Sequence, residues 1–174
     1  MDSTYLIISG TTRKTSKSLQ ISSLYQNLLS QHNIESKLLS LEDLPIEIFN
    51  INSKSDVLKK LESELLIPSS KLIFIVPEYN GSFPGSLKLL MDCCDTKNSF
   101  WNKKAALIGI ADGRNGNLRG LDHLTGVLNY LKINVLHYKV NIPFITKSLD
   151  EKNAMNNHEI QDLLMKQINE FIKF

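Results

Sequence analysis

Apolar residues along this chain fall into five short runs, and longer stretches of mixed residues separate them. The runs are Tyr5–Ser9, Ile34–Leu41, Leu72–Val76, Ala105–Ile110 and Ile133–Tyr138. The middle runs are apolar at successive positions, which is typical of strands that are buried on both faces. The pattern therefore predicts a sheet of five strands that is covered by helices on both sides.

The stretches between the strands predict helices, because their apolar residues recur every three or four positions. The first helix is expected to begin at Ser16 or Ser18, with a serine as its N-cap. Its inward-facing residues are expected to be Leu19, Leu24, Leu28 and Leu29. The other predicted helices are Asp56–Leu66, Leu87–Asp92, Leu118–Leu131 and Ile160–Ile172. Connections without a steady period are predicted at Glu42–Asn52, Asn98–Lys103 and Asn141–Asn157.

This alternation of strand and helix predicts a parallel, doubly wound α/β sheet, since parallel neighbours need crossover connections. Crossovers of this kind are almost always right-handed, which leaves few topologies. We expect the flavodoxin-like arrangement, a five-stranded parallel sheet in the order 2-1-3-4-5 with helices on both faces. The chain shows no internal repeat or low-complexity linker, so residues 1–174 are expected to form one domain.

The composition is that of an ordinary soluble domain, with 42% hydrophobic and 22% charged residues. Lys and Arg number 20 against 18 Asp and Glu, a net charge of +2 that gives no reason to expect nucleic acid or a membrane surface as partner. No apolar run approaches the roughly 20 residues needed to span a bilayer. No basic-then-apolar signal opens the chain, and the four His lack metal-ligand spacing. A cytoplasmic, metal-free protein is expected.

The two cysteines are neighbours, Cys93 and Cys94, and a disulfide between them would close a strained ring. Two thiols on a helix are the expected state, and a redox-active pair is the alternative.

Three strands end in loops of unusual composition, and in the expected topology these loops share one edge of the sheet. Open α/β folds bind ligands at that edge. The loop after the first strand, residues 11–18, carries hydroxyls and cations before a helix, which suits a phosphate. It has no G-x-x-x-x-G-K pattern, so ATP is not indicated. A plain helix cap on a solvated loop is the alternative interpretation.

The loop after the third strand, Pro77–Lys88, reads P-E-Y-N-G-S-F-P-G-S-L-K. Tyr79 offers an aromatic face, Asn80 a donor and an acceptor, and Gly81 room for a ligand to approach the backbone. A tight strand-to-helix turn is the alternative. The loop after the fourth strand, Ala111–Asn117, contains two glycines and Arg114, and either covers a bound ring or only turns the chain.

The sequence of residues 77–88 resembles the signature of the NADPH-dependent FMN reductase family, which is close to P-E-Y-N-x-S-x-P-G-x-L-K. Gly10, Thr11, Arg13 and Ser16 resemble that family's loop after the first strand, and Leu41–Pro45 resembles its D-L-P segment. The similarity extends from about residue 4 to residue 135.

The resemblance implies an FMN site whose residues come from all three loops. It places the FMN phosphate at Thr11, Arg13, Ser16 and Ser18. It places the isoalloxazine ring against Pro77, Glu78, Tyr79, Asn80 and Gly81, largely through backbone N–H groups. It adds flavin contacts from Asp112, Gly113 and Arg114. No side chain is expected to act as a catalytic acid or base.

The resemblance also implies the reaction. A hydride from NADPH or NADH would reach flavin N5, and the electrons would pass to a small acceptor such as a quinone, an azo compound, free flavin or a metal oxyanion. A homodimer or homotetramer is implied as well. Two alternatives are a flavodoxin-type electron carrier without NAD(P)H activity and a non-catalytic domain that keeps the fold. The nearly neutral charge disfavours the carrier, because flavodoxins are usually strongly acidic.

Overall fold

The computed structural model describes residues 4–52, 54–149 and 158–174. A central parallel sheet has the strand order β2-β1-β3-β4-β5, and β6 pairs with β4 beyond the end of β5, so the expected order is confirmed. The strands are β1 (Tyr5–Ser9), β2 (Ser36–Ser40), β3 (Lys71–Pro77), β4 (Lys104–Ile110), β5 (Asn134–Val135) and β6 (Val140–Ile142).

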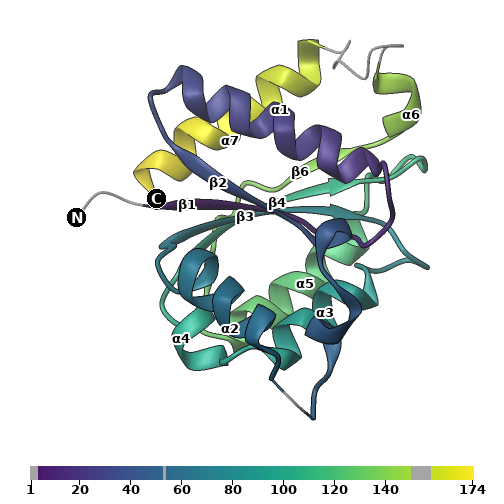
Figure 1. Ribbon diagram of the computed structural model, residues 1–174. Helices are drawn as coiled ribbons and strands as arrows, with labels where there is room; N and C mark the ends of the chain where they lie inside the picture. The colour runs from purple at the N-terminus through teal and green to yellow at the C-terminus, as the bar shows by residue number, and fades with distance from the viewer. Residues whose placement is uncertain (1–3, 53, 150–157) are drawn as a thin grey trace.

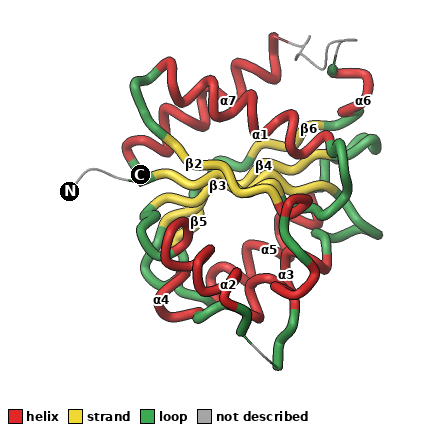
Figure 2. The backbone as a smooth tube through the Cα atoms, in the orientation of Figure 1, coloured by secondary structure: helices red, strands yellow, loops and turns green. Residues whose placement is uncertain are grey.

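Helices cover both faces of this sheet (Figures 1 and 2). One face carries α1 (Lys17–Gln31) and α7 (His158–Lys173), and α6 (Ile145–Ser148) lies on the same side. The other face carries α2 (Asp56–Leu61), the π-helical turn η3 (Glu62–Leu66), α3 (Gly85–Cys93), α4 (Thr96–Phe100) and α5 (Leu118–Tyr130).

The strands contribute alternate residues to two hydrophobic cores, as the pleat of a strand requires. In β3, Leu72, Phe74 and Val76 pack with α2, α3 and α5. Its other two apolar residues, Ile73 and Ile75, pack with α1 and α7. All five are 0% exposed, which confirms the expectation that this strand is covered on both faces.

Helix α1 begins where a serine was expected, because Ser16 is its N-cap and accepts a hydrogen bond from the Leu19 N–H. The expected inward face is partly wrong. Leu28 and Leu29 are buried, but Ile21 and Tyr25 fill the core in place of Leu19 and Leu24, which stay only partly covered. Leu28 and Leu29 lie three and four residues after Tyr25 and share its buried face, since residues three or four apart lie on one side of a helix.

The fifth strand is shorter than predicted. The expected run Ile133–Tyr138 pairs with β4 only at Asn134 and Val135, and pairing resumes at β6. The buried side chain of Gln167 in α7 occupies the gap, donating hydrogen bonds to the carbonyls of Leu107 (3.0 Å) and Tyr138 (2.8 Å). This amide satisfies carbonyls that a continuous ladder would have paired, and it could not be read from the pattern of the strand.

Three other segments differ from the sequence-based expectation. The connection Glu42–Asn52 contains two 3₁₀ turns, η1 (Leu41–Asp43) and η2 (Ile46–Phe49). Helix α4 enters the expected loop Asn98–Lys103, because Asp95 caps it through the Asn98 N–H. The predicted helix Asp56–Leu66 ends as a π-turn. Of the polar stretch Asn141–Asn157, residues 150–157 lie outside the described part.

Buried lysines close the amino-terminal edge of the sheet by capping helix ends. Lys103 donates hydrogen bonds to the carbonyls of Leu66 (2.6 Å), Ile67 (3.1 Å) and Ser69. Lys71 donates to the carbonyls of Phe171 (2.6 Å) and Ile172 (2.9 Å). Cations are favourable at helix carboxyl ends, where carbonyls lack partners within the helix. Burial nevertheless lowers the pKa of Lys103 to about 8.

This pKa predicts a pH-dependent contribution of Lys103 to stability. An unfolded lysine has a pKa of about 10.4, so between about pH 8 and pH 10.4 the unfolded chain binds more protons and folding is favoured as pH rises. The pKa values of Tyr25 and Cys94 are raised by burial, which acts in the opposite sense, so a comparison of variants is needed. The unfolding free energy of wild type minus that of Lys103→Met, measured by urea titration, should rise with pH across this window. It should not change between pH 6 and 7.5. If wild type minus variant falls towards pH 10, the lowered pKa of Lys103 is contradicted.

Candidate functional site

A pocket of about 280 Å³ lies at the carboxyl ends of β1, β3 and β4, where the sequence predicted three loops to meet. Its wall contains Thr11, residues 13–18, residues 77–79, residues 110–112 and Ile145. Neighbouring parallel strands bring their carboxyl ends to one edge, so loops distant in sequence become adjacent. The pocket unites all of the expected phosphate residues with the first three residues of the expected ring cradle.

The first loop presents a buried, unpartnered hydroxyl at the start of α1. The Oγ of Ser18 is enclosed and makes no hydrogen bond within residues 4–52, 54–149 and 158–174. Buried polar atoms are nearly always hydrogen-bonded, but six other side-chain atoms of the described residues also lack a partner, so Ser18 argues for a ligand only together with the rest of the pocket wall. Ser16 is committed differently, since its Oγ accepts from Leu19 and donates to the Glu42 carboxylate at 3.3 Å. Ser16 thus serves mainly to begin α1 at the pocket.

Residues 11–18 carry three cations, Arg13, Lys14 and Lys17, which have different roles. Lys17 lies near Asp112 and helps to lower the pKa of its carboxyl group. The Lys14 ammonium donates to the Glu42 carbonyl and lies 4.0 Å from the Asp43 carboxylate. Arg13 has no acidic partner in the described part of the chain, and its guanidinium carbon lies 4.7 Å above the centre of the Tyr79 ring. Arg13 is therefore the cation that this loop offers to an anion.

The second loop makes a tight turn at residues 79–82. Tyr79 and Ser82 exchange backbone hydrogen bonds of 2.8 and 3.0 Å, and Asn80 (φ 52°) and Gly81 (φ 75°) occupy the left-handed region between them. The Glu78 N–H is also used, by the carbonyl of Ile110. Pro77 has no N–H, so among the expected ring residues Pro77–Gly81 only Asn80 and Gly81 keep a backbone N–H without a partner in the described part of the chain. Both residues lie outside the pocket wall.

The side chain of Tyr79 turns towards the first loop. Its hydroxyl lies 2.5 Å from the Thr11 Oγ1, and Thr11 is 2% exposed. The Thr11 hydroxyl also accepts the backbone N–H of Arg13 at 3.3 Å. A residue that the sequence assigned to the ring thus contacts two residues assigned to the phosphate.

The third loop contributes one of its three expected residues to the pocket wall. Asp112 lines the pocket and accepts a hydrogen bond from the Thr146 N–H at 3.1 Å, and the bonds from Thr146 lower the pKa of its carboxyl group. Gly113 and Arg114 are exposed and lie outside the wall. Asp112 therefore ties α6 to the pocket.

The sequence missed three residues around the site. Ile145 enters the pocket wall from α6, because its N–H bonds to the Ala111 carbonyl and so holds α6 beside the third loop. Asn117 is 1% exposed and donates from Nδ2 to the Val76 carbonyl, joining the end of β3 to the start of α5. His123 lies 2.9 Å from the Ser82 hydroxyl through Nδ1. Of these three residues, only Asn117 could have been found from the sequence, because asparagine is suited to the left-handed backbone conformation that can precede a helix.

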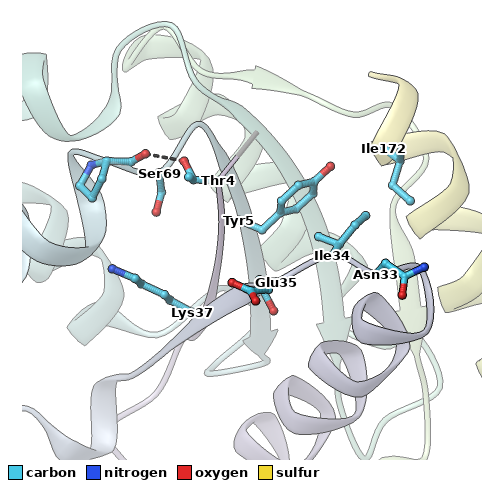
Figure 3. A pocket seen from close by; sticks show the side chains of 10 residues that line it. Thr4, Tyr5, Asn33, Ile34, Glu35, Lys37, Ser69 and Ile172 are labelled. Atoms are coloured by element: carbon cyan, nitrogen blue, oxygen red, sulfur yellow. Dashed lines mark hydrogen bonds between the residues drawn. The ribbon is translucent and has the colours of Figure 1, made fainter. Parts of the chain in front are cut away.

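A larger pocket, about 660 Å³, lies at the opposite edge of the sheet (Figure 3). Thr4, Tyr5, Ile34 and Ile172 are among the residues around it. The Thr4 hydroxyl within it already donates to the Pro68 carbonyl. The wall of this larger pocket also contains Ser36, whose enclosed Oγ lacks a partner among the described residues, as Ser18 Oγ does. The smaller pocket is nevertheless the better ligand site, because it lies at the carboxyl ends of the strands and contains Arg13, a cation with no acidic partner in the described part of the chain.

The described residues contain no cluster of His, Cys, Asp and Glu that could hold a metal ion. They also contain no helix that is long and apolar enough to cross a membrane. Both cysteines are free thiols, as expected, and burial raises the pKa of Cys94.

Comparison with known proteins agrees with this fold. The NAD(P)H-dependent FMN reductase LOT6 of Saccharomyces cerevisiae is 30% identical over 128 residues, which span 71% of this chain and 65% of the yeast protein. The flavoenzyme NAD(P)H:(acceptor) oxidoreductase FerB from Paracoccus denitrificans has the same fold, with a TM-score of 0.81 at 22% identity over 99% of this chain and 96% of that chain. A flavodoxin from the domain Archaea superimposes with a TM-score of 0.63 at 12% identity over 99% and 100% of the two chains. The model of the NADPH-dependent FMN reductase family matches residues 4–147, so this chain belongs to that family.

Proposed function

We propose that this protein is an NAD(P)H-dependent oxidoreductase that holds FMN in the pocket at the carboxyl ends of β1, β3 and β4. The observation that carries the proposal is that Ser18, whose enclosed hydroxyl lacks a partner among the described residues, and Arg13, which has no acidic partner among them, line the same pocket. An anionic group suits this pair, because it accepts the hydroxyl hydrogen and neutralises the guanidinium.

The chain offers a separate group of residues for each part of the cofactor. Thr11, Arg13 and Ser18 would hold the phosphate, with Ser16 orienting α1 towards it. The N–H groups of Asn80 and Gly81 would bind the polar edge of the ring, since they have no partner among the described residues. Asp112, Gly113 and Arg114 would cover the ring from the third loop, and Ile145 would keep water from its side.

FMN would supply the redox chemistry, taking a hydride from NADPH or NADH at N5 and giving electrons to a small acceptor. The residues of the chain would bind FMN and orient its ring. Backbone N–H donors directed at a ring edge favour an anionic ring, because they are fixed in place before charge develops. The acceptor belongs to the classes that such a flavin can reduce, namely quinones, azo compounds, free flavins and metal oxyanions.

One anaerobic experiment tests the proposal. The purified protein is reconstituted with FMN, freed of unbound flavin, and mixed with NADPH and separately with NADH while the visible flavin bands are recorded. Rapid bleaching by either nucleotide is the expected result. Bound flavin that neither nucleotide bleaches would show an electron carrier instead, and protein that takes up no FMN would refute the proposal.

We also propose that residues 1–174 form one domain, and that the protein is a homodimer or homotetramer in the cytoplasm. A groove of about 480 Å³ along α3 and α5 supports this assembly, and Tyr130 in its wall is 87% exposed. Large exposed aromatic side chains are typical of subunit contacts. Sedimentation equilibrium of the full chain should give two or four subunits, and a monomer at micromolar concentration would refute the assembly.

A further inference from the structure

We propose that Tyr79 acts at the phosphate end of the flavin, where its hydroxyl and the Arg13 guanidinium stacked on its ring let the site select FMN over riboflavin. The inference rests on the proposed function, since it assigns a residue of the same pocket. It changes the assignment of Tyr79, which the sequence alone places against the isoalloxazine ring.

The backbone of Tyr79 leaves only its side chain for a ligand. Its N–H and carbonyl are both used in the pair of hydrogen bonds with Ser82. The side chain extends to Thr11 on the neighbouring β1 loop, whereas the N–H groups of Asn80 and Gly81 have no partner among the described residues. Tyr79 therefore meets a ligand on the side of the pocket that carries the hydroxyls and Arg13.

The hydroxyl pair of Thr11 and Tyr79 keeps one hydrogen for a ligand. The two oxygens lie 2.5 Å apart and either can be the donor. Each hydroxyl has a single hydrogen, so whichever group accepts keeps its own hydrogen unused. The Thr11 oxygen already accepts the Arg13 N–H as well, which leaves it little capacity to accept from a ligand. The pair is thus a donor, and it suits a phosphate oxygen.

The ring of Tyr79 also fixes the direction of Arg13. The guanidinium carbon lies 4.7 Å above the ring centre, within the range of a cation–π contact. Stacking holds the flat guanidinium against the ring and leaves its donor edge open to an anion. A phosphate bound here meets a charge whose position is set before the ligand arrives, which lowers the entropy lost on binding.

The test compares two flavins that differ at one end. Riboflavin has the ring and ribityl chain of FMN without its phosphate, so the ratio of the two dissociation constants reports the phosphate end. Apoprotein is titrated with each flavin and the quenching of flavin fluorescence is followed. We expect Tyr79→Phe to weaken FMN binding by about tenfold or more and riboflavin binding by less than about twofold, because a hydrogen bond to a charged group is lost.

Two further variants separate the hydroxyl from the ring. Tyr79→Leu should weaken FMN binding by a few-fold more than Tyr79→Phe, because it also removes the platform of Arg13. Thr11→Val removes the other hydroxyl of the pair at constant shape, and we expect the same FMN-selective loss. Thr11→Val keeps the inference testable if the Tyr79 variants fail to fold, as judged by circular dichroism.

Tyr138→Phe is a matched control, because Tyr138 also carries a cation above its ring, with Lys166 at 4.8 Å, but lies outside the pocket wall. This variant should leave the affinities for FMN and riboflavin unchanged. Equal weakening of FMN and riboflavin in Tyr79→Phe would place the hydroxyl at the ring end and overturn the inference, as would no change in either. Wild-type apoprotein that binds neither flavin would instead overturn the proposed function, and the inference with it.

Discussion

Replacing Gly109 by alanine is expected to destabilise the protein by about 3 kcal/mol, because the new methyl group has no space on either side. A Cβ at this position in β4 would lie 2.4 Å from the Gly116 carbonyl oxygen and 3.1 Å from both the Asn141 Nδ2 and the Leu121 Cγ. The nearest of these is a backbone atom, so relief requires a shift of the third loop. Such a shift would also disturb Asn117, which holds the end of β3.

Neighbouring contacts show why the third loop cannot easily move. The Gly116 carbonyl accepts the Asn141 side-chain amide at 3.0 Å. Gly116 has a φ of +53° and packs against β6, where a Cβ of its own would lie 2.7 Å from the Ile142 nitrogen. Protein interiors are packed as densely as organic crystals, so a shift here is passed on to neighbouring atoms.

Gly126→Ala is the matched control for Gly109→Ala. Gly126 lies in the interior of α5, and among the described residues no atom beyond its chain neighbours and the adjoining backbone of the helix would lie within 4 Å of an added Cβ. Alanine there should stabilise the helix by about 0.5 to 1 kcal/mol, through the lower entropy of the unfolded chain. Urea unfolding of both variants, followed by circular dichroism, measures the contrast. If Gly109→Ala loses less than about 1 kcal/mol, the packing around Gly116 is looser than the structure shows.

Replacing Arg13 by alanine is expected to weaken FMN binding by about 10- to 100-fold, the loss of one or more hydrogen bonds to a charged group. The expected loss is large because Arg13 has no competing acidic partner among the described residues and is oriented by Tyr79. Riboflavin affinity should change little, since the variant removes only an interaction with the phosphate. Fluorescence titration of the apoprotein measures both constants.

Lys14→Ala is the matched control for Arg13→Ala, because it removes the same charge from the adjacent position. The Lys14 ammonium is already occupied by the Glu42 carbonyl and the Asp43 carboxylate, so its loss should weaken FMN binding by less than about threefold at physiological salt. Equal effects of the two variants would mean that the loop attracts FMN through net charge alone. In that case the direct contact of Arg13 with the phosphate would be refuted.

The amino-acid sequence by itself determined the order of the elements, the parallel sheet and the edge at which three loops meet. It could do so because these features depend on local patterns. Continuous apolar strands such as Leu72–Val76 must be covered on both faces, and this requirement together with right-handed crossovers leaves few topologies. The capping serine Ser16 and the left-handed pair Asn80 and Gly81 are likewise local in origin.

Tertiary structure decided what depends on contacts between distant residues. Gln167 interrupts the fifth strand because its side-chain amide donates hydrogen bonds to the carbonyls of Leu107 and Tyr138, which lie 60 and 29 residues away in the sequence. The loop that carries Tyr79 has an aromatic face in the sequence, but only the adjacency of β1 and β3 brings its hydroxyl to Thr11, 68 residues away. A side chain's direction is set by the neighbours that compete for it, and a linear pattern does not contain them. Local periodicity therefore located the pocket, and long-range hydrogen bonds set which of its residues face which end of a ligand.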